Sequence, residues 1–143
     1  MSGLRGWIGV DLDGTLAHYD GWKGADHIGP PVEPMLARVK QWIKDGRDVR
    51  ILTARVSHDG SHARMVEAQM ATIHIMDWCA RYVGAVLPVT CTKDYAMIEL
   101  WDDRAVTVVP NVGRTCCDIA RTASRVTQDE ELRAAQPTSG GEG

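Results

Sequence analysis

Short apolar runs that alternate with helical patterns constrain the fold of this chain more than any other feature. Five runs rich in β-branched residues have the length and composition of buried strands, and they cover residues 7–10, 49–52, 85–89, 98–101 and 105–109. The third run contains a proline, which cannot donate a ladder hydrogen bond, so we expect this run at a sheet edge. Strand, helix, strand, helix, strand is the order that right-handed crossovers produce in a parallel sheet. The sequence therefore predicts an α/β fold with a mainly parallel sheet.

Two helical patterns separate the first three runs. Apolar residues recur at helical spacing over 35–43, where Pro34 suits the first turn and Gly46 the C-terminal stop. Ser61 is a candidate N-cap for a second helix that Gly84 ends. We expect the inner face of this second helix to carry Val66, Met70, Ile73, Met76, Ala80 and Val83.

The length of 143 residues is typical of one domain, which we place at residues 1–126. A long loop rich in Gly, His and aromatic residues, 17–31, is a candidate lid. A weaker helical pattern covers 114–125. From there on Glu, Gln, Pro, Ser and Gly dominate, so we expect a disordered tail over 127–143.

Composition excludes several classes of protein. The net charge of -3 is too mild for a nucleic-acid-coating surface, so we expect no tight nucleic-acid binding. No apolar run is long enough to cross a bilayer, and the first residues carry no signal-peptide pattern. The four cysteines form no C-x-x-C pair, which disfavours a zinc ribbon or a disulfide framework. We expect a cytoplasmic protein with reduced thiols, and the sequence leaves a homodimer open.

Polar residues gather directly after the predicted strands. In an open parallel sheet the carboxyl ends of the strands share one edge, so these residues are expected to lie together. Four carboxylates at one edge require a cation, and hard oxygen ligands without His or Cys indicate Mg²⁺. The residues in question are Asp11, Asp13, Thr53, Lys93, Asp102 and Asp103.

The spacing of Asp11 and Asp13 indicates phosphoryl transfer. Residues two apart in an extended segment point the same way, so both carboxylates can address one site. Gly14 then permits the chain to turn away. An ionised aspartate needs no activating base, which suits Asp11 to act as a nucleophile that forms an aspartyl-phosphate. Asp13 would have to carry a proton to assist a leaving group.

The motif Asp11-Leu12-Asp13-Gly14-Thr15-Leu16 resembles the first motif of the haloacid dehalogenase superfamily of phosphohydrolases. The strand closed by Thr53 is similar to the second motif, Lys93 matches the third, and Asp102-Asp103 resembles the acidic fourth. All four occur in the family order over residues 6–110. The resemblance implies a three-layer α/β/α, Rossmann-like fold with the first strand near the sheet centre. It also implies a Mg²⁺-dependent phosphomonoester hydrolase.

The resemblance also implies catalytic roles. Asp11 would attack phosphorus, and Asp13 would protonate the leaving group and later activate water. Thr53 and Lys93 would hold the phosphoryl oxygens, and Ala54 is expected beside them in the phosphate-binding set.

The metal would be bound by Asp11, the backbone carbonyl of Asp13 and Asp102, with Asp103 in its outer shell. Gly14, between these groups, is expected to lie against the bound phosphate.

Neither gap between motifs is long enough for a separate cap domain, so a capless member with an open site is expected. Tyr19 and Trp22 belong to the candidate lid, whereas Arg55 and Arg104 are expected to be structural, pairing with a site carboxylate or facing solvent. The expected substrate is a phosphorylated small molecule. Two alternatives stay open: a nucleotide or polynucleotide-end phosphatase, and a non-catalytic binding module that keeps the fold and metal site.

Overall fold

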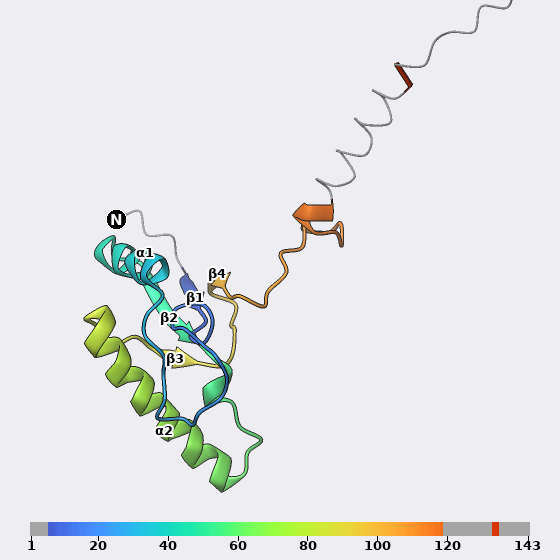
Figure 1. Cartoon of the computed structure of the whole chain (residues 1–143). Helices are drawn as coiled ribbons and strands as arrows, with labels where there is room; N and C mark the ends of the chain where they lie inside the picture. Colours follow the sequence, from blue (N-terminus) through green and yellow to red (C-terminus); the bar gives the residue numbers. More distant parts are fainter. Residues whose placement is uncertain (1–5, 119–132, 135–143) are drawn as a thin grey trace, which may run out of the picture. The chain divides into compact units, whose positions relative to one another are not determined.

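The computed structural model describes residues 6–118 and 133–134 (Figure 1). The chain divides into two compact units, residues 1–104 and 105–143, and each is described by itself. The expected domain boundary at residue 126 and nearly all of the expected tail lie outside the described residues. The first unit holds every residue of the candidate site, and its described residues, 6–104, form no separate cap domain.

The first unit is built on a four-stranded, all-parallel sheet in the order β3-β2-β1-β4. Its strands are β1 (Trp7–Val10), β2 (Asp48–Leu52), β3 (Val89–Thr90) and β4 (Met97–Trp101). All four residues of β1 are buried, and the strand has a neighbour on each side. The predicted α/β class, the parallel sheet and the inner position of the first strand are thus confirmed, and the proline-containing third run does lead to an edge strand.

The two predicted helices form where the sequence signals place them. They are α1 (Glu33–Lys44), with a proline in its first turn, and α2 (His62–Trp78). Ser61 accepts a hydrogen bond from the backbone N–H of Arg64, as an N-cap does. A π-helical segment, η2 (Cys79–Val83), prolongs α2 as far as Gly84, which adopts a left-handed conformation.

Both helices pack on the same face of the sheet. Every second residue of β1 and β2 points to this face, including Ile8 and Ile51, and both are fully buried. These residues form one core cluster with Leu36 of α1 and Ile75 of α2. This one-sided packing is expected because two right-handed crossovers that progress in the same direction place their helices on the same face.

The opposite face of the sheet is crossed by the loop 91–96 instead of a helix. Asp94 in this loop accepts a hydrogen bond from Nε1 of Trp7 at 2.8 Å, and the Trp7 backbone N–H donates to the carbonyl of Ala96. Leu100 on β4 is 39% exposed on this face. Within the described residues there is therefore one helical layer, and the predicted three-layer arrangement is not seen among them.

The predicted inner face of α2 is wrong in most of its members. Met70 and Ile73 are about half exposed, whereas Ala71, Ile75 and Trp78 face the core. The helix is apolar on opposite sides, so periodicity could not decide which side is buried. The expected inner residues that are exposed are Val66, Met70, Ile73, Met76 and Ala80, and Val83 alone is buried.

Among the described residues no helix is long and apolar enough to cross a membrane.

Two predicted strands also need correction. The third is only two residues long, because the chain over 85–88 is irregular after Gly84. Its first hydrogen bond to β2 is the one that the Pro88 carbonyl accepts from the Ile51 N–H. The fifth, over 105–109, is not a strand: in the second unit Val108 makes a single bridge to Thr115. Val106 and Val108 are 69% and 52% exposed, and no strand among the described residues lies against this run, so β-propensity alone does not produce a ladder.

Candidate active site

A cleft of about 970 Å³ opens at the carboxyl ends of the strands. The ladders continue past the strand ends and bring the motif residues to its wall: the Asp11 N–H donates to the carbonyl of Trp101, and the Thr53 N–H to that of Thr90. The predicted site residues that line the cleft are Asp11, Asp13, Thr53, Ala54, Asp102 and Asp103. The structure therefore brings together residues from three separate sequence motifs.

Three of the expected four carboxylates form one cluster. Asp11, Asp102 and Asp103 each place an oxygen within 4.8 Å of the others, and within the described part of the chain no ammonium or guanidinium pairs with any of them. Burial raises the pKa of Asp11 to about 7, and a hydrogen bond with Asp103 and the charge of Asp102 act in the same direction. An all-oxygen set of this kind fits Mg²⁺, which would relieve the repulsion.

Thr15 fixes the orientation of Asp103. Its hydroxyl donates to the Asp103 carboxylate at 3.1 Å and accepts from the Asp103 backbone N–H at 3.0 Å. Gly14 has a φ of +87°, and a Cβ at this position would lie 2.7 Å from an Asp103 carboxylate oxygen. The turn after Asp13 therefore needs glycine both for its backbone conformation and for the space that the acidic cluster occupies.

Replacing Gly14 with alanine is expected to disturb the acidic cluster as well as the fold. Gly46 is the matched control, because its φ is +77° and a Cβ there meets no atom within 4 Å. Gly46→Ala should lower the free energy of unfolding by about 1 kcal/mol for its left-handed backbone alone. Gly14→Ala should cost more and should also weaken Mg²⁺ binding by calorimetry. Equal losses of stability with equal Mg²⁺ affinity would contradict the role given to the contact with Asp103.

The fourth carboxylate, Asp13, pairs with a cation instead of joining the cluster. The Arg55 guanidinium donates to both Asp13 oxygens, from Nε at 2.6 Å and from Nη2 at 2.8 Å. The Arg55 side chain is only 5% exposed. All four expected carboxylates thus line the cleft, but only three of them form the close cluster. Of the two roles expected for Arg55, the structure contains the pairing with a site carboxylate.

Thr53 is the one buried polar residue of the described core, at 2% exposure. Its side chain accepts from the Arg55 N–H at 3.2 Å and caps the short 3₁₀ helix η1 (Ala54–Val56). The hydroxyl thus lies at the cleft wall at the start of a tight turn, with Ala54 beside it. We see no hydrogen bond donated by this hydroxyl within residues 6–118, which leaves its proton for a ligand.

Two expected substrate-binding residues do not line the cleft. Lys93 is exposed, and it lies in the loop that leaves the carboxyl edge to reach Trp7 across the far face of the sheet. The Gly14 N–H donates to the carbonyl of Ala17 within the turn, at 2.9 Å. Sequence order correctly placed Lys93 after a strand but could not indicate how sharply the chain turns back after Cys91.

The candidate lid forms part of the cleft wall. Tyr19 and Trp22 line the cleft and are 43% and 60% exposed. The base of the loop is fixed, because Ala17 pairs with Pro31 and Trp78 donates to the carbonyl of Gly29. The loop therefore presents two aromatic rings at the cleft from a fixed base.

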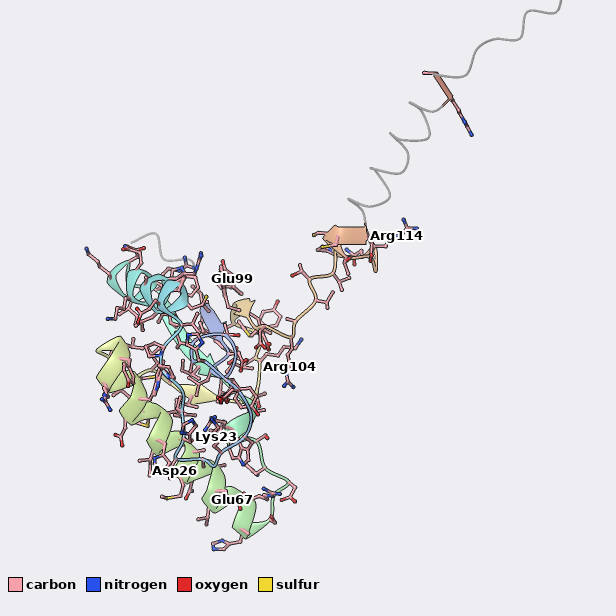
Figure 2. All side chains as sticks on the ribbon, viewed as in Figure 1. Lys23, Asp26, Glu67, Glu99, Arg104 and Arg114 are labelled. Carbon is pink, nitrogen blue, oxygen red and sulfur yellow. The ribbon has the colours of Figure 1, made fainter. Side chains whose placement is uncertain are left out.

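The structure adds cleft residues that the sequence did not single out as site residues. Arg64 and Glu67, an exposed ion pair on α2, line the cleft, as does Cys91. Figure 2 labels Glu67 on the N-terminal half of α2 and Arg104 directly after β4. Helical spacing of Arg64 and Glu67 signals an i,i+3 pair, but no sequence pattern places that pair beside the cleft.

Comparison with protein-family models, curated proteins and solved structures finds no match to this chain.

Proposed function

We propose that this chain is a Mg²⁺-dependent phosphomonoester hydrolase that acts through an aspartyl-phosphate, as its resemblance to capless members of the haloacid dehalogenase superfamily implies. The observation that carries the proposal is the cluster of Asp11, Asp102 and Asp103 at the carboxyl edge of a parallel sheet. Thr53, from the neighbouring strand, lies in the same cleft. The three-layer, Rossmann-like core of that family belongs to this proposal by resemblance alone.

Asp11, Asp102 and Asp103 are the side chains that would hold Mg²⁺, with the backbone carbonyl of Asp13 as a further ligand by resemblance. When bound, the ion would neutralise charge on the phosphoryl oxygens and keep the three carboxylates ionised. The ionised Asp11 is then the nucleophile of the cleft.

In the first step an Asp11 carboxylate oxygen forms a bond to phosphorus, and the bond between phosphorus and the leaving oxygen breaks. Protonated Asp13 gives its proton to the leaving oxygen. In the structure both Asp13 oxygens accept from Arg55, as in an ion pair, so the transfer requires one oxygen to exchange this contact for the proton while the other still accepts from Arg55.

In the second step water attacks phosphorus, and the bond between phosphorus and Asp11 breaks. Asp13, now a carboxylate, takes the proton of the attacking water and so returns to its starting state. Inorganic phosphate leaves and the Asp11 carboxylate is regenerated. One carboxyl group can serve both steps because each step leaves it in the protonation state that the next step needs.

Phosphoryl oxygens would be held by the Thr53 hydroxyl, whose proton is unused, beside Ala54 on the cleft wall. The role proposed for Lys93 rests on the resemblance, because its side chain does not line the cleft. Thr53 is therefore the better supported of the two ligands.

A nucleotide or the phosphorylated end of a polynucleotide is the second candidate substrate class. Trp22 and Tyr19 offer exposed aromatic faces at the cleft, and bases stack on such faces. Arg104 also lines the cleft and pairs with no carboxylate among the described residues, so it could meet a second phosphate. Turnover of an oligonucleotide 3′-phosphate that does not change with salt would count against the polynucleotide version.

The test is release of inorganic phosphate from a panel of aryl, alkyl, nucleoside and oligonucleotide phosphomonoesters, with Mg²⁺ and with chelator. We expect turnover of an aryl phosphate that requires Mg²⁺, and faster turnover of whichever class stacks on the lid aromatics. Binding of a phosphate ester without release of phosphate from any member of the panel would favour the non-catalytic binding module. Release that persists in chelator would contradict the metal requirement.

A further inference from the structure

Arg55 connects two parts of the cleft that the sequence treats separately. Besides its two hydrogen bonds to Asp13, the guanidinium donates to the carbonyl of His27 at 2.9 Å and to that of Ala25 at 3.3 Å. Its central carbon lies 4.9 Å from the centre of the Trp22 ring. One buried cation thus contacts both Asp13 and the candidate lid.

The tip of the lid has few other attachments. Between residues 19 and 28, Arg55 is the only residue from outside the loop, within the described chain, whose side chain hydrogen-bonds to it. Lys23 pairs with Asp20 inside the loop, and the His27 N–H donates to Gly24, also inside it. The orientation of the tip therefore depends mainly on Arg55 and on the partly buried Ala25 and Ile28.

The guanidinium is well suited to this double contact. Its planar fork matches a carboxylate with two parallel hydrogen bonds, and its remaining N–H groups can reach carbonyls on the other side. A lysine ammonium at the same place would keep the charge but would lose the fixed plane and the stacking on Trp22. The arrangement thus depends on the shape of arginine as well as on its charge.

We propose that Arg55 is a positioning residue that couples the lid 17–31 to Asp13, so that the aromatic tip and the general acid are held in place as one unit. The catalytic part of this inference rests on the proposed phosphatase activity. The structural part, the dependence of the tip on Arg55, does not. Substrate that moves Trp22 would thereby also move the cation that orients Asp13.

The leaving group distinguishes positioning of the acid from a general structural effect. Nitrophenolate leaves readily without a proton, whereas an alkoxide needs one. In Arg55→Lys we expect kcat for an alkyl phosphate to fall about 100-fold and kcat for nitrophenyl phosphate to fall only a few-fold.

Arg50→Lys is the matched control. Arg50 also forms a two-pronged pair, with Asp48, and also stacks on a tryptophan, Trp7, but it is not part of the cleft. Both activities should be unchanged in this variant. Equal losses for the two substrates in Arg55→Lys would overturn the coupling to Asp13.

The lid is tested separately by hydrogen–deuterium exchange of the full chain. We expect residues 19–28 to exchange several-fold faster in Arg55→Lys than in wild type, while α2 stays protected. Should Arg55→Lys fold poorly, Asp13→Asn removes the other half of the pair and should loosen the same segment. Unchanged exchange in the tip of a folded Arg55→Lys, or of Asp13→Asn if the former does not fold, would overturn the proposal. If the wild type hydrolyses no phosphate ester, the phosphatase proposal fails while this exchange result still decides whether Arg55 holds the lid.

Discussion

Asp11→Asn is expected to reduce phosphate release by at least about 10³-fold while leaving the chain folded. The amide is neutral and a poor nucleophile, so the step that forms the aspartyl-phosphate cannot proceed. The loss should appear in kcat, because Thr53 and the rest of the cleft wall still bind the phosphoryl group. The measurement is steady-state release of phosphate from nitrophenyl phosphate in the presence of Mg²⁺.

The control for this variant is Asp77→Asn, which removes one exposed carboxylate from α2 away from the cleft. It should behave as wild type. Asp11→Asn should also melt no lower than wild type in chelator near pH 8, because it removes one of three crowded charges. Full activity in Asp11→Asn would exclude the covalent mechanism. Thermal unfolding in chelator shows whether an inactive Asp11→Asn is still folded.

The strand ends were predictable because two local signals agree. A short apolar run that is followed at once by Asp or Thr gives the strand, its end and the polar residue together, as in β1 with Asp11 and β2 with Thr53. Parallel order then brings those ends to one edge without any knowledge of side-chain contacts. The helices were predictable from local signals too: a proline in the first turn of α1, the Ser61 N-cap of α2, and Gly84 at the end of η2.

What could not be predicted depends on contacts between distant residues. From its position two residues after Thr53, the Arg55 side chain could either pair with a site carboxylate or face solvent. Only the burial of this side chain beside Asp13 shows that it forms the pair. Lys93 is close to the fourth motif in sequence, yet the path taken by the loop 91–96 toward Trp7 decides whether it reaches the cleft. The buried side of α2 was misassigned because both sides of that helix are apolar, so only packing against the sheet distinguishes Ile75 from Ile73.

The acidic cluster predicts that the stability of the metal-free chain falls as the pH rises from about 4 to 7. The pKa of Asp11 is raised from its ordinary value of 3.8 to about 7, first by burial and then by Asp103 and Asp102. Over that interval the unfolded chain has released the proton while the folded chain still holds it. The unfolded state then binds fewer protons, so the free energy of unfolding decreases with pH and levels off above about 7.

Mg²⁺ reverses this loss because it favours the ionised cluster. At a free concentration about 100 times its dissociation constant, a bound ion adds about 2.7 kcal/mol. For a chain of this size that corresponds to a rise in Tm of about 10 °C. We expect the full rise near pH 8 and a much smaller one near pH 5, where protons compete with the ion for Asp11. The measurement is thermal unfolding with chelator and with Mg²⁺ at both pH values.

Asp102→Asn separates the ion site from nonspecific salt effects. It removes a ligand and also a charge that raises the pKa of Asp11, so the variant should lose most of the Mg²⁺ stabilisation and show a weaker pH dependence in chelator. Asp77→Asn, outside the cluster, should keep both. Stabilisation by Mg²⁺ that is equal at the two pH values, or that survives in Asp102→Asn, would place the ion elsewhere. Because unfolding requires no substrate, this experiment tests the metal site even if the natural phosphate ester is not in the panel.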